Sequence, residues 1–330
     1  MNDDIIVKFE DVTIDYLLKN QTLRAVSNVS LNIKKGKITA FVGESGSGKT
    51  TLVSSLIQNI SSPGKVTNGK VWFYDGDKPI DVISLNSKEI NSFRWEEVSM
   101  VFQASQSTLN PLNTIYESLY ETAFWHNKIT SKEEFNEHVN YLLDLVKLDK
   151  ERVLKSYPHQ LSGGMKQRLM IVLALLLNPK LIILDEPTTA LDVITQEYIF
   201  NQLLEIKEKF NITMILLTHD IGVVAKTADY VAVMYSGSIM EYGDVYTVFD
   251  KKMHPYTKGL IEATPSILVD VENVKPIPGN PPDIRNLPKG CPFSERCSRA
   301  TEKCICNKPQ LCEIEKDHFI NCFMYEEGVE

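Results

Sequence analysis

Cysteine is absent from the first 290 residues of this 330-residue chain, and all six cysteines fall in the last 40. Long apolar runs are absent too, because the longest, residues 169–177, has about half of the roughly 18 residues needed to span a bilayer. The N-terminal residues MNDDIIVK contain no apolar segment typical of signal peptides. These absences argue against a disulfide-rich secreted body and predict a cytoplasmic chain, in which any membrane role must come through a partner.

An excess of positive charge is also missing, since 35 Lys and Arg residues are set against 43 Asp and Glu residues, for a net charge of −8. A broad surface that binds nucleic acid by neutralising phosphates is therefore not expected. With 43% hydrophobic and 24% charged residues, the composition is that of a globular protein without internal repeats or low-complexity tracts. At this length we expect one large domain, alone or with a small one.

Short aliphatic runs alternate with helical patterns over the first 250 residues. Continuous runs of β-branched and aliphatic residues are typical of strands buried on both faces of a mainly parallel sheet. Such runs occur at residues 37–42, 181–184, 213–217 and 231–234. The predicted fold class is therefore α/β, with a mixed sheet as its core.

Between about residues 104 and 170 the pattern becomes helical. Apolar side chains at helical spacing predict an amphipathic helix that packs into a core. We therefore expect a helical subdomain beside the sheet, within a first domain of residues 1–250. The apolar stripe consists of Phe135, Val139, Leu142, Leu143 and Val146.

After residue 250 the composition changes. Nine of the fifteen prolines lie beyond this point, several of them in the string IPGNPPD at residues 277–283. Proline favours extended and turn conformations over helix or central strand. Residues 251–330 are therefore predicted to form a small C-terminal module, rich in proline and cysteine and poor in secondary structure.

Residues 43–50 read GESGSGKT and stand between a predicted strand and a helical run. Gly46 and Gly48 allow backbone N–H groups to curl round a phosphate, and the start of the following helix adds a positive field. Lys49 can reach the β and γ phosphates, and Thr50 can place its hydroxyl on Mg²⁺. The candidate nucleotide-binding residues of this phosphate loop are Gly43, Glu44, Ser45, Gly46, Ser47, Gly48, Lys49, Thr50 and Thr51.

A second candidate site follows the apolar run LIIL, which ends in two carboxylates at Asp185 and Glu186. Asp185, at the end of the strand, suits Mg²⁺, directly or through water. Glu186 is placed to polarise an attacking water molecule. Two adjacent acids on a loop are ordinarily just solvated, but the buried strand before them and Pro187 after them favour a catalytic role.

Two further strings are LSGGMKQR at residues 161–168 and DEPTTALDVITQ at residues 185–196. Together with the phosphate loop, they resemble the ATP-binding cassette ATPases, which are the motor subunits of ABC transporters. The resemblance covers about residues 5–325. It implies a P-loop NTPase fold with a helical subdomain, ATP and Mg²⁺ as cofactors, and ATP hydrolysis as the activity.

The resemblance also implies roles for single residues, with Gln103 and His219 joining Glu186 in catalysis. Gln103 in VFQ matches the family's glutamine loop, which contacts Mg²⁺ or the attacking water, and His219 in LLTHD matches the histidine that senses the γ-phosphate. Tyr16, after VTI, matches an aromatic ring that stacks on adenine. Asp192 in ALD matches a loop that crosses the dimer interface.

The string LSGG resembles the family's signature motif, which acts on the nucleotide of a partner subunit. In a head-to-tail dimer, Ser162, Gly163 and Gly164 of one subunit would bind the γ-phosphate held by Lys49 of the other. Backbone amides and the start of a helix would supply the positive field. ATP binding would then close the dimer, and hydrolysis would release it.

Three strings resemble the dipeptide and oligopeptide importers within the family: HPYTKGL at residues 254–260, IPGNPPD, and GCPFSERC at residues 290–297. They imply an ATPase at the cytoplasmic face of the membrane that drives peptide import. Its implied partners are a second ATPase chain, favouring a heterodimer, two membrane permeases and an external binding protein. The alternatives are import of nickel or oligosaccharides, and a redox-regulated ABC ATPase without a transport role.

The cysteines lie in a proline-rich segment with few apolar residues, where a bound metal can contribute folding free energy. Four thiolates suit either Zn²⁺ or an iron–sulfur cluster. The absence of a close CxxC pair disfavours zinc. The family resemblance implies a 4Fe-4S cluster, and unligated thiols are the third alternative. The ligands that the resemblance implies are Cys291, Cys297, Cys304 and Cys322.

Cys306 and Cys312 depart from the family pattern, and either could replace one of the four ligands. His318 could also be a ligand, although we favour a packing or surface role for it.

Overall fold

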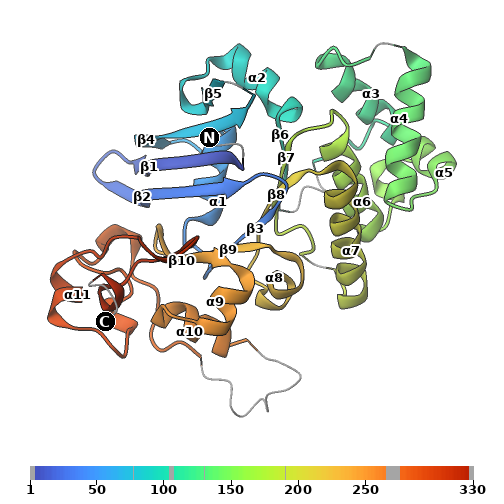
Figure 1. Ribbon diagram of the computed structural model, residues 1–330. Helices are drawn as coiled ribbons and strands as arrows, with labels where there is room; N and C mark the ends of the chain where they lie inside the picture. Colours follow the sequence, from blue (N-terminus) through green and yellow to red (C-terminus); the bar gives the residue numbers. More distant parts are fainter. Residues whose placement is uncertain are drawn as a thin grey trace. The chain divides into compact units, whose positions relative to one another are not determined.

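The chain forms two compact units, residues 1–84 with 216–330, and residues 85–215 (Figure 1). The phosphate loop and the cysteine-rich tail belong to the first unit, and the signature string and Glu186 belong to the second. The computed structural model describes residues 4–76, 78–103, 108–129, 131–189, 191–264 and 276–326.

The first unit begins with an antiparallel sheet whose strand order is β2-β1-β4-β5. Phe9 pairs with Val71 across β1 and β4, and Val7 pairs with Phe73. All four side chains are fully buried, and such cross-strand pairs stabilise a sheet. The strands are β1 (Ile5–Leu17), β2 (Thr22–Lys34), β4 (Gly64–Asp75) and β5 (Lys78–Asp81).

The first unit also contains the strands that flank the phosphate loop. Strand β3 lies parallel to β9, which pairs antiparallel with β10. Strand β12 pairs antiparallel with β10, and β11 pairs antiparallel with β12. All five residues of β3 are buried, which explains its continuous aliphatic run. The strands are β3 (Ile38–Val42), β9 (Tyr230–Tyr235), β10 (Ser238–Asp244), β11 (Cys312–Glu315) and β12 (His318–Ile320).

Side-chain caps start three helices of the first unit. Asp220 accepts a hydrogen bond from the backbone of Val223, and Asp244 accepts one from Thr247. At the start of α10, His254 Nδ1 accepts a hydrogen bond from the backbone N–H of Tyr256. The helices are α1 (Lys49–Ser54), α8 (Ile221–Thr227), α9 (Val245–Lys251), α10 (Pro255–Glu262) and α11 (Glu302–Cys306).

The second unit is mainly helical around the parallel pair β6 (Val98–Val101) and β7 (Leu181–Asp185). All five residues of the predicted apolar stripe are buried, and four of them lie on α4, as expected. Strand β8 (Thr213–Leu217) leads the chain into the first unit. The helices are α2 (Ser87–Glu96), α3 (Ile115–Trp125), α4 (Lys132–Leu145), α5 (Lys150–Lys155), α6 (Gly163–Leu175) and α7 (Val193–Phe210).

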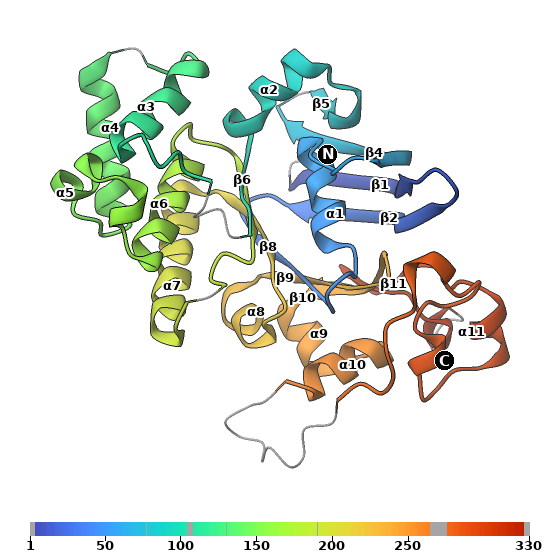
Figure 2. The same ribbon diagram turned by 180° about the vertical axis from the view of Figure 1, so that it is seen from behind.

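The fold class is the α/β class predicted, and the four strands expected from aliphatic runs are β3, β7, β8 and β9. Residues 276–326 contain only short elements and cluster with the first unit. Figure 2 labels α11 and β11, two of these short elements. The assignment of residues 251–330 as a module of its own stays a prediction, and residues 265–275 lie outside the described part of the chain.

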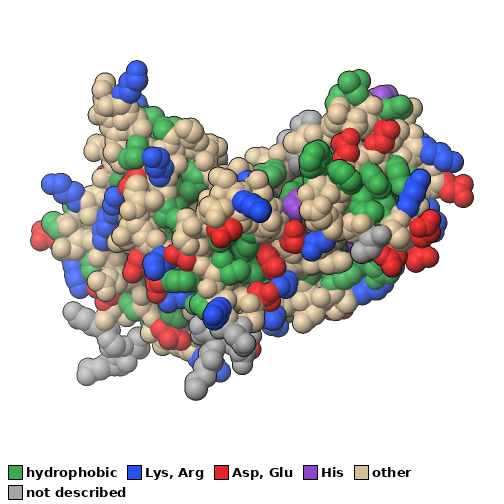
Figure 3. Space-filling view, turned by 90° about the horizontal axis from the view of Figure 1, so that it is seen from above, with side chains coloured by type: hydrophobic (Ala, Val, Ile, Leu, Met, Phe, Trp, Pro, Cys, Tyr) green, Lys and Arg blue, Asp and Glu red, His purple; other side chains and the backbone are tan. Residues whose placement is uncertain are grey.

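In the described ranges, no helix combines the length and the apolar character needed to cross a membrane. Lysine, arginine, aspartate and glutamate side chains are intermingled on the face drawn in Figure 3. No extended area of one charge is visible among the described residues of that face.

Candidate functional site

The phosphate loop lies between β3 and α1, as predicted, and glycine is required at two of its positions. Gly43 has φ 146°, and a Cβ there would lie 2.1 Å from the carbonyl oxygen of Met234. Gly48 has φ 98°, and a Cβ there would lie 2.6 Å from the carbonyl oxygen of Ala25. Both the backbone conformation and the close approach of neighbouring backbone therefore exclude a side chain at these positions.

The Lys49 ammonium lies within the curve of the loop. Lys49 Nζ donates to the carbonyl oxygens of Gly43 at 2.7 Å and Glu44 at 3.1 Å, and to Ser47 Oγ at 3.2 Å. Thr50, at the start of α1, is exposed, as are Ser45 and Gly46 at the tip of the loop, and Thr51 is half-buried. A cation enclosed by a loop whose tip is exposed is suited to binding a phosphate group.

A cavity of about 260 Å³ lies beside the loop. The sequence predicted the loop on one side of this cavity but not the residues on its other side. One side consists of the loop and strand β2, and the other consists of the turn after β9 and the proline-rich segment of the C-terminal residues. The lining residues are Arg24, Ala25, Glu44, Ser45, Gly46, Ser47, Tyr235, Ser236, Pro281, Pro282, Ile284 and Leu287.

The other predicted residues of the first unit are Tyr16 and His219. Tyr16 lies near the end of β1, where it pairs with Leu23 of β2 and Gly64 of β4. His219 is exposed and directly follows the buried residue Thr218 after β8. Neither side chain is among the described residues that line the cavity beside the loop.

In the second unit, Gln103 and Glu186 are in direct contact. Gln103 Nε2 donates to Glu186 Oε2 at 2.8 Å, and Thr189 Oγ1 donates to the same oxygen at 3.0 Å. Glu186 follows the buried Asp185 at the end of β7 and has φ 47°. A left-handed backbone at a non-glycine residue costs free energy, and such strain is concentrated at functional sites. The two hydrogen bonds from Gln103 and Thr189 hold the Glu186 carboxylate in one orientation.

The signature residues and Asp192 are adjacent in the second unit. Ser162 Oγ caps α6 by accepting from the backbone N–H of Met165 at 3.4 Å, and Gly163 is exposed. Asp192 caps α7, accepting from the Thr195 N–H at 3.0 Å and Oγ1 at 2.7 Å, and these hydrogen bonds lower the pKa of Asp192. A Cβ at Gly164 would lie 3.1 Å from Thr195 Cγ2, so Thr195 links the two motifs.

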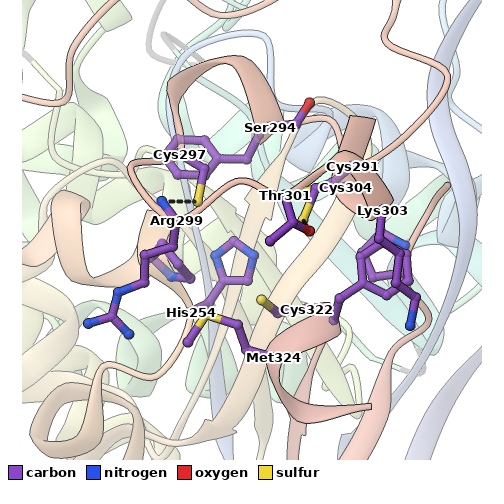
Figure 4. A pocket seen from close by; sticks show the side chains of 14 residues that line it. His254, Cys291, Ser294, Cys297, Arg299, Thr301, Lys303, Cys304, Cys322 and Met324 are labelled. Atoms are coloured by element: carbon purple, nitrogen blue, oxygen red, sulfur yellow. Dashed lines mark hydrogen bonds between the residues drawn. The ribbon is translucent and has the colours of Figure 1, made fainter. Parts of the chain in front are cut away.

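The four cysteines named from the family pattern line one cavity of about 260 Å³ (Figure 4). The backbone N–H of Arg299 donates to Cys297 Sγ at 3.4 Å, and Cys304 Sγ lies 3.4 Å from Thr301 Oγ1. Burial raises the pKa of the Cys291 thiol to about 11, with a further contribution from the neighbouring thiols. The cavity lining includes Cys291, Cys297, Cys304, Cys322, His254, Phe293 and Met324.

Within the described parts of the chain, no three His, Cys, Asp or Glu side chains are grouped closely enough to hold a metal ion. The structure thus gives no support to the predicted 4Fe-4S cluster or to a bound zinc ion. Cys306 is exposed, and Cys312 donates its thiol hydrogen to the carbonyl oxygen of Gln310 or Ile320. Neither residue is among those that line the cysteine cavity.

His318 has a packing role that also involves a carboxylate the sequence did not single out. His318 Nε2 lies 3.0 Å from Glu241 Oε1, and Glu241 also accepts hydrogen bonds from the backbone N–H groups of Met253 and His254. Glu241 is fully buried, and His318 is 1% exposed. The contacts join β10, the start of α10 and β12. Burial lowers the pKa of His254 to about 4, so its imidazole stays neutral at pH 7.

Comparison with known proteins gives matches over nearly the whole chain. An ABC transporter model matches residues 26–189, and a model of the oligopeptide/dipeptide transporter C-terminal region matches residues 240–304. The chain is 42% identical over 324 residues to the dipeptide transport ATP-binding protein of Caldanaerobacter subterraneus subsp. tengcongensis, with 98% of each chain covered. It is 40% identical over 321 residues to the oligopeptide transport ATP-binding protein of Escherichia coli K12, with 97% of this chain and 93% of that chain covered.

Among solved structures, the chain is similar to a dimeric ATP-binding cassette in a post-hydrolysis state, bound to ADP and Pi. The TM-score is 0.63 at 32% identity, with 73% of this chain and 99% of that chain covered.

Proposed function

This chain belongs to the family of ABC transporter ATP-binding subunits for dipeptides and oligopeptides, and we propose roles for its residues in the ATPase cycle. It is an ATP-hydrolysing motor subunit of a peptide importer. The observation that supports this most is that a dipeptide transport ATP-binding protein matches over 98% of the chain, and that residues 240–304 match the oligopeptide/dipeptide transporter C-terminal region.

The phosphate loop binds the triphosphate, with Lys49 neutralising the β and γ phosphates and Thr50 placing its hydroxyl on Mg²⁺. Asp185 is the second Mg²⁺ partner. Glu186 polarises the attacking water, and its hydrogen bond from Gln103 at 2.8 Å supports this role because it orients the carboxylate. In this scheme, Tyr16 stacks on adenine and His219 senses the γ-phosphate.

The exposed starts of α6 and α7 face a second ATPase subunit. Ser162 and Gly163 are exposed although they follow the buried Leu161, and Val193 and Ile194 beside Asp192 are 76% and 82% exposed. Exposed apolar side chains of this size are typical of surfaces that a partner covers. We favour a heterodimer that works with two permeases and an external binding protein at the cytoplasmic face of the membrane.

Peptide import is tested with the transporter complex that is purified by affinity capture of this chain. Proteoliposomes that contain it should take up labelled di- to hexapeptides only when MgATP is present on the side of this subunit, and Lys49→Ala should abolish uptake because the phosphates lose their main cation. The purified complex also shows whether the second ATPase chain is different. Uptake of Ni²⁺ or oligosaccharides without peptide uptake would contradict the peptide assignment, and purification without permeases would favour a role outside transport.

For the cysteine cavity we retain the 4Fe-4S cluster as our proposal. Four thiols around one cavity fit the ligand set of such a cluster. Four thiolates also suit a zinc ion, which stays the alternative. Cys291, Cys297, Cys304 and Cys322 would hold the cluster. When bound, it would contribute folding free energy to a segment with few apolar side chains.

Chain purified without oxygen should contain about four iron atoms and absorb near 400 nm if the cluster is present. Cys297→Ser should remove both signals, whereas Cys306→Ser should keep them, because Cys306 is exposed and outside the cavity lining. Stoichiometric zinc without iron, or neither metal, would contradict the cluster.

A further inference from the structure

Glu44, the second residue of the phosphate loop, is held at both its backbone and its side chain by residues far along the chain. Its backbone N–H donates to Tyr256 Oη at 3.0 Å, across 212 positions of sequence. Its Oε2 accepts from Arg296 Nη1 at 2.9 Å, across 252 positions. The side chains of Arg296 and Glu44 are only 7% and 25% exposed, so this ion pair is largely shielded from water.

Arg296 is itself fixed in place. Its guanidinium also donates to the carbonyl oxygen of Pro278 at 2.8 Å and to Tyr235 Oη at 3.1 Å. It lies over the ring of Tyr235, 5.6 Å from the centroid, and 6.0 Å from that of Phe293. A shielded charge pair is stable only when its remaining hydrogen-bonding groups are satisfied, and these contacts satisfy the guanidinium. The position of the guanidinium is therefore fixed by contacts other than the one with Glu44.

The pair matters because of where the carboxylate is. Glu44 lines the cavity beside the loop together with Ser45, Gly46 and Ser47. A free carboxylate at this place would repel the negative charges of a triphosphate. Arg296 supplies the opposite charge at 2.9 Å, and its hydrogen bond restricts the rotation of the Glu44 side chain.

We propose that Arg296 is a positioning residue of the ATP site, which acts through Glu44 to fix the phosphate loop and to cancel the carboxylate charge. The proposal rests on the proposed function, in which this loop binds ATP. It makes the C-terminal residues a part of the nucleotide site, although none of them belongs to the phosphate loop.

The experiment is a double-mutant cycle on the full chain, with calorimetric titration of MgATP. Arg296→Gln should weaken ATP binding about tenfold, because it leaves the Glu44 carboxylate unpaired. Adding Glu44→Gln to that variant should restore about threefold or more of the loss, because the repelling charge is then gone. Arg296→Lys should lose less affinity than Arg296→Gln, since it keeps the charge but not the fixed set of donors.

The matched control is Arg285→Gln, which replaces another arginine of the C-terminal residues. Arg285 forms an ion pair with Asp283, and both side chains are exposed, at 66% and 46%. This variant should bind ATP like the wild-type chain, although it loses the same charge. In the assembled transporter, Arg296→Gln should raise KM for ATP with a smaller change in kcat, because the pair acts on bound ATP and transition state alike.

The outcomes separate this inference from the proposed function. A wild-type chain that binds no ATP would contradict the function itself. A wild-type chain that binds ATP, with Arg296→Gln binding equally well, overturns only the inference. The same holds if Glu44→Gln deepens the loss instead of relieving it, since a merely structural arginine would give that result. If Arg296→Gln does not fold, Arg296→Lys is measured in the wild-type and in the Glu44→Gln backgrounds. A loss of ATP affinity and a raised KM in the wild-type background alone support the proposal. Equal losses in both backgrounds overturn it.

Discussion

Glu186→Gln should bind ATP as the wild-type chain does and lose about 10²- to 10⁴-fold of its ATPase activity in the assembled transporter. The substitution keeps the size of the side chain and leaves the phosphate loop untouched, but it removes the carboxylate that we propose polarises the attacking water. Because ATP then stays bound, the variant should accumulate as a closed ATPase dimer. Steady-state phosphate release and ATP retention on the purified complex measure the two effects.

The control for this variant is Glu208→Gln, an exposed glutamate on α7 of the same unit. It changes the net charge by the same amount and should hydrolyse ATP at the wild-type rate. Unchanged ATPase activity in Glu186→Gln would show that another group acts as the base. Loss of ATP binding in the same variant would instead place the carboxylate in binding.

Glu241→Ala should lower the free energy of unfolding by about 3 to 5 kcal/mol, because buried donors left without an acceptor cost about 1 to 3 kcal/mol each. Glu241 is fully buried and accepts from two backbone N–H groups and lies 3.0 Å from the His318 ring. The alanine variant leaves the donors of Met253, His254 and His318 without this acceptor. Urea denaturation followed by circular dichroism measures the loss.

Glu315→Ala is the matched control, since it also removes a carboxylate from the C-terminal residues. Glu315 pairs with Lys251 at the surface, with side chains 53% and 38% exposed, and such pairs contribute little. The control should unfold at the wild-type urea concentration. Equal losses in both variants would contradict the view that Glu241 anchors β12 and α10.

Patterns of neighbouring residues predicted the strands and helices that depend on local chemistry. The run ITAFV forms β3 with all five residues buried, because a strand covered on both faces needs apolar side chains throughout. The stripe from Phe135 to Val146 is buried in the same way along one side of α4. The phosphate loop was predictable because its backbone needs positive φ angles that glycine adopts without strain, as Gly43 and Gly48 do.

The candidate site was predictable in part. Glu186 was named from the two acids after an apolar run and Gln103 from the family resemblance, and the structure brings their side chains within 2.8 Å. Four cysteines were named as one ligand set, and they line one cavity. No pattern indicated the contact of Thr195 with Gly164, because it depends on how the starts of α6 and α7 pack. The positive φ of Glu186 is likewise visible only in the backbone.

The sequence by itself determined the family, the phosphate loop and the identity of the chemical groups, because these depend on residue type at short spacing. It also placed the cysteines in the last 40 residues, apart from a cysteine-free body. Only the tertiary structure decided that Arg296 of this tail and Tyr256 of α10 both meet Glu44 of the phosphate loop. These contacts join residues that are 212 and 252 positions apart in the sequence. Such contacts are set by the packing of a whole unit, which no local pattern encodes.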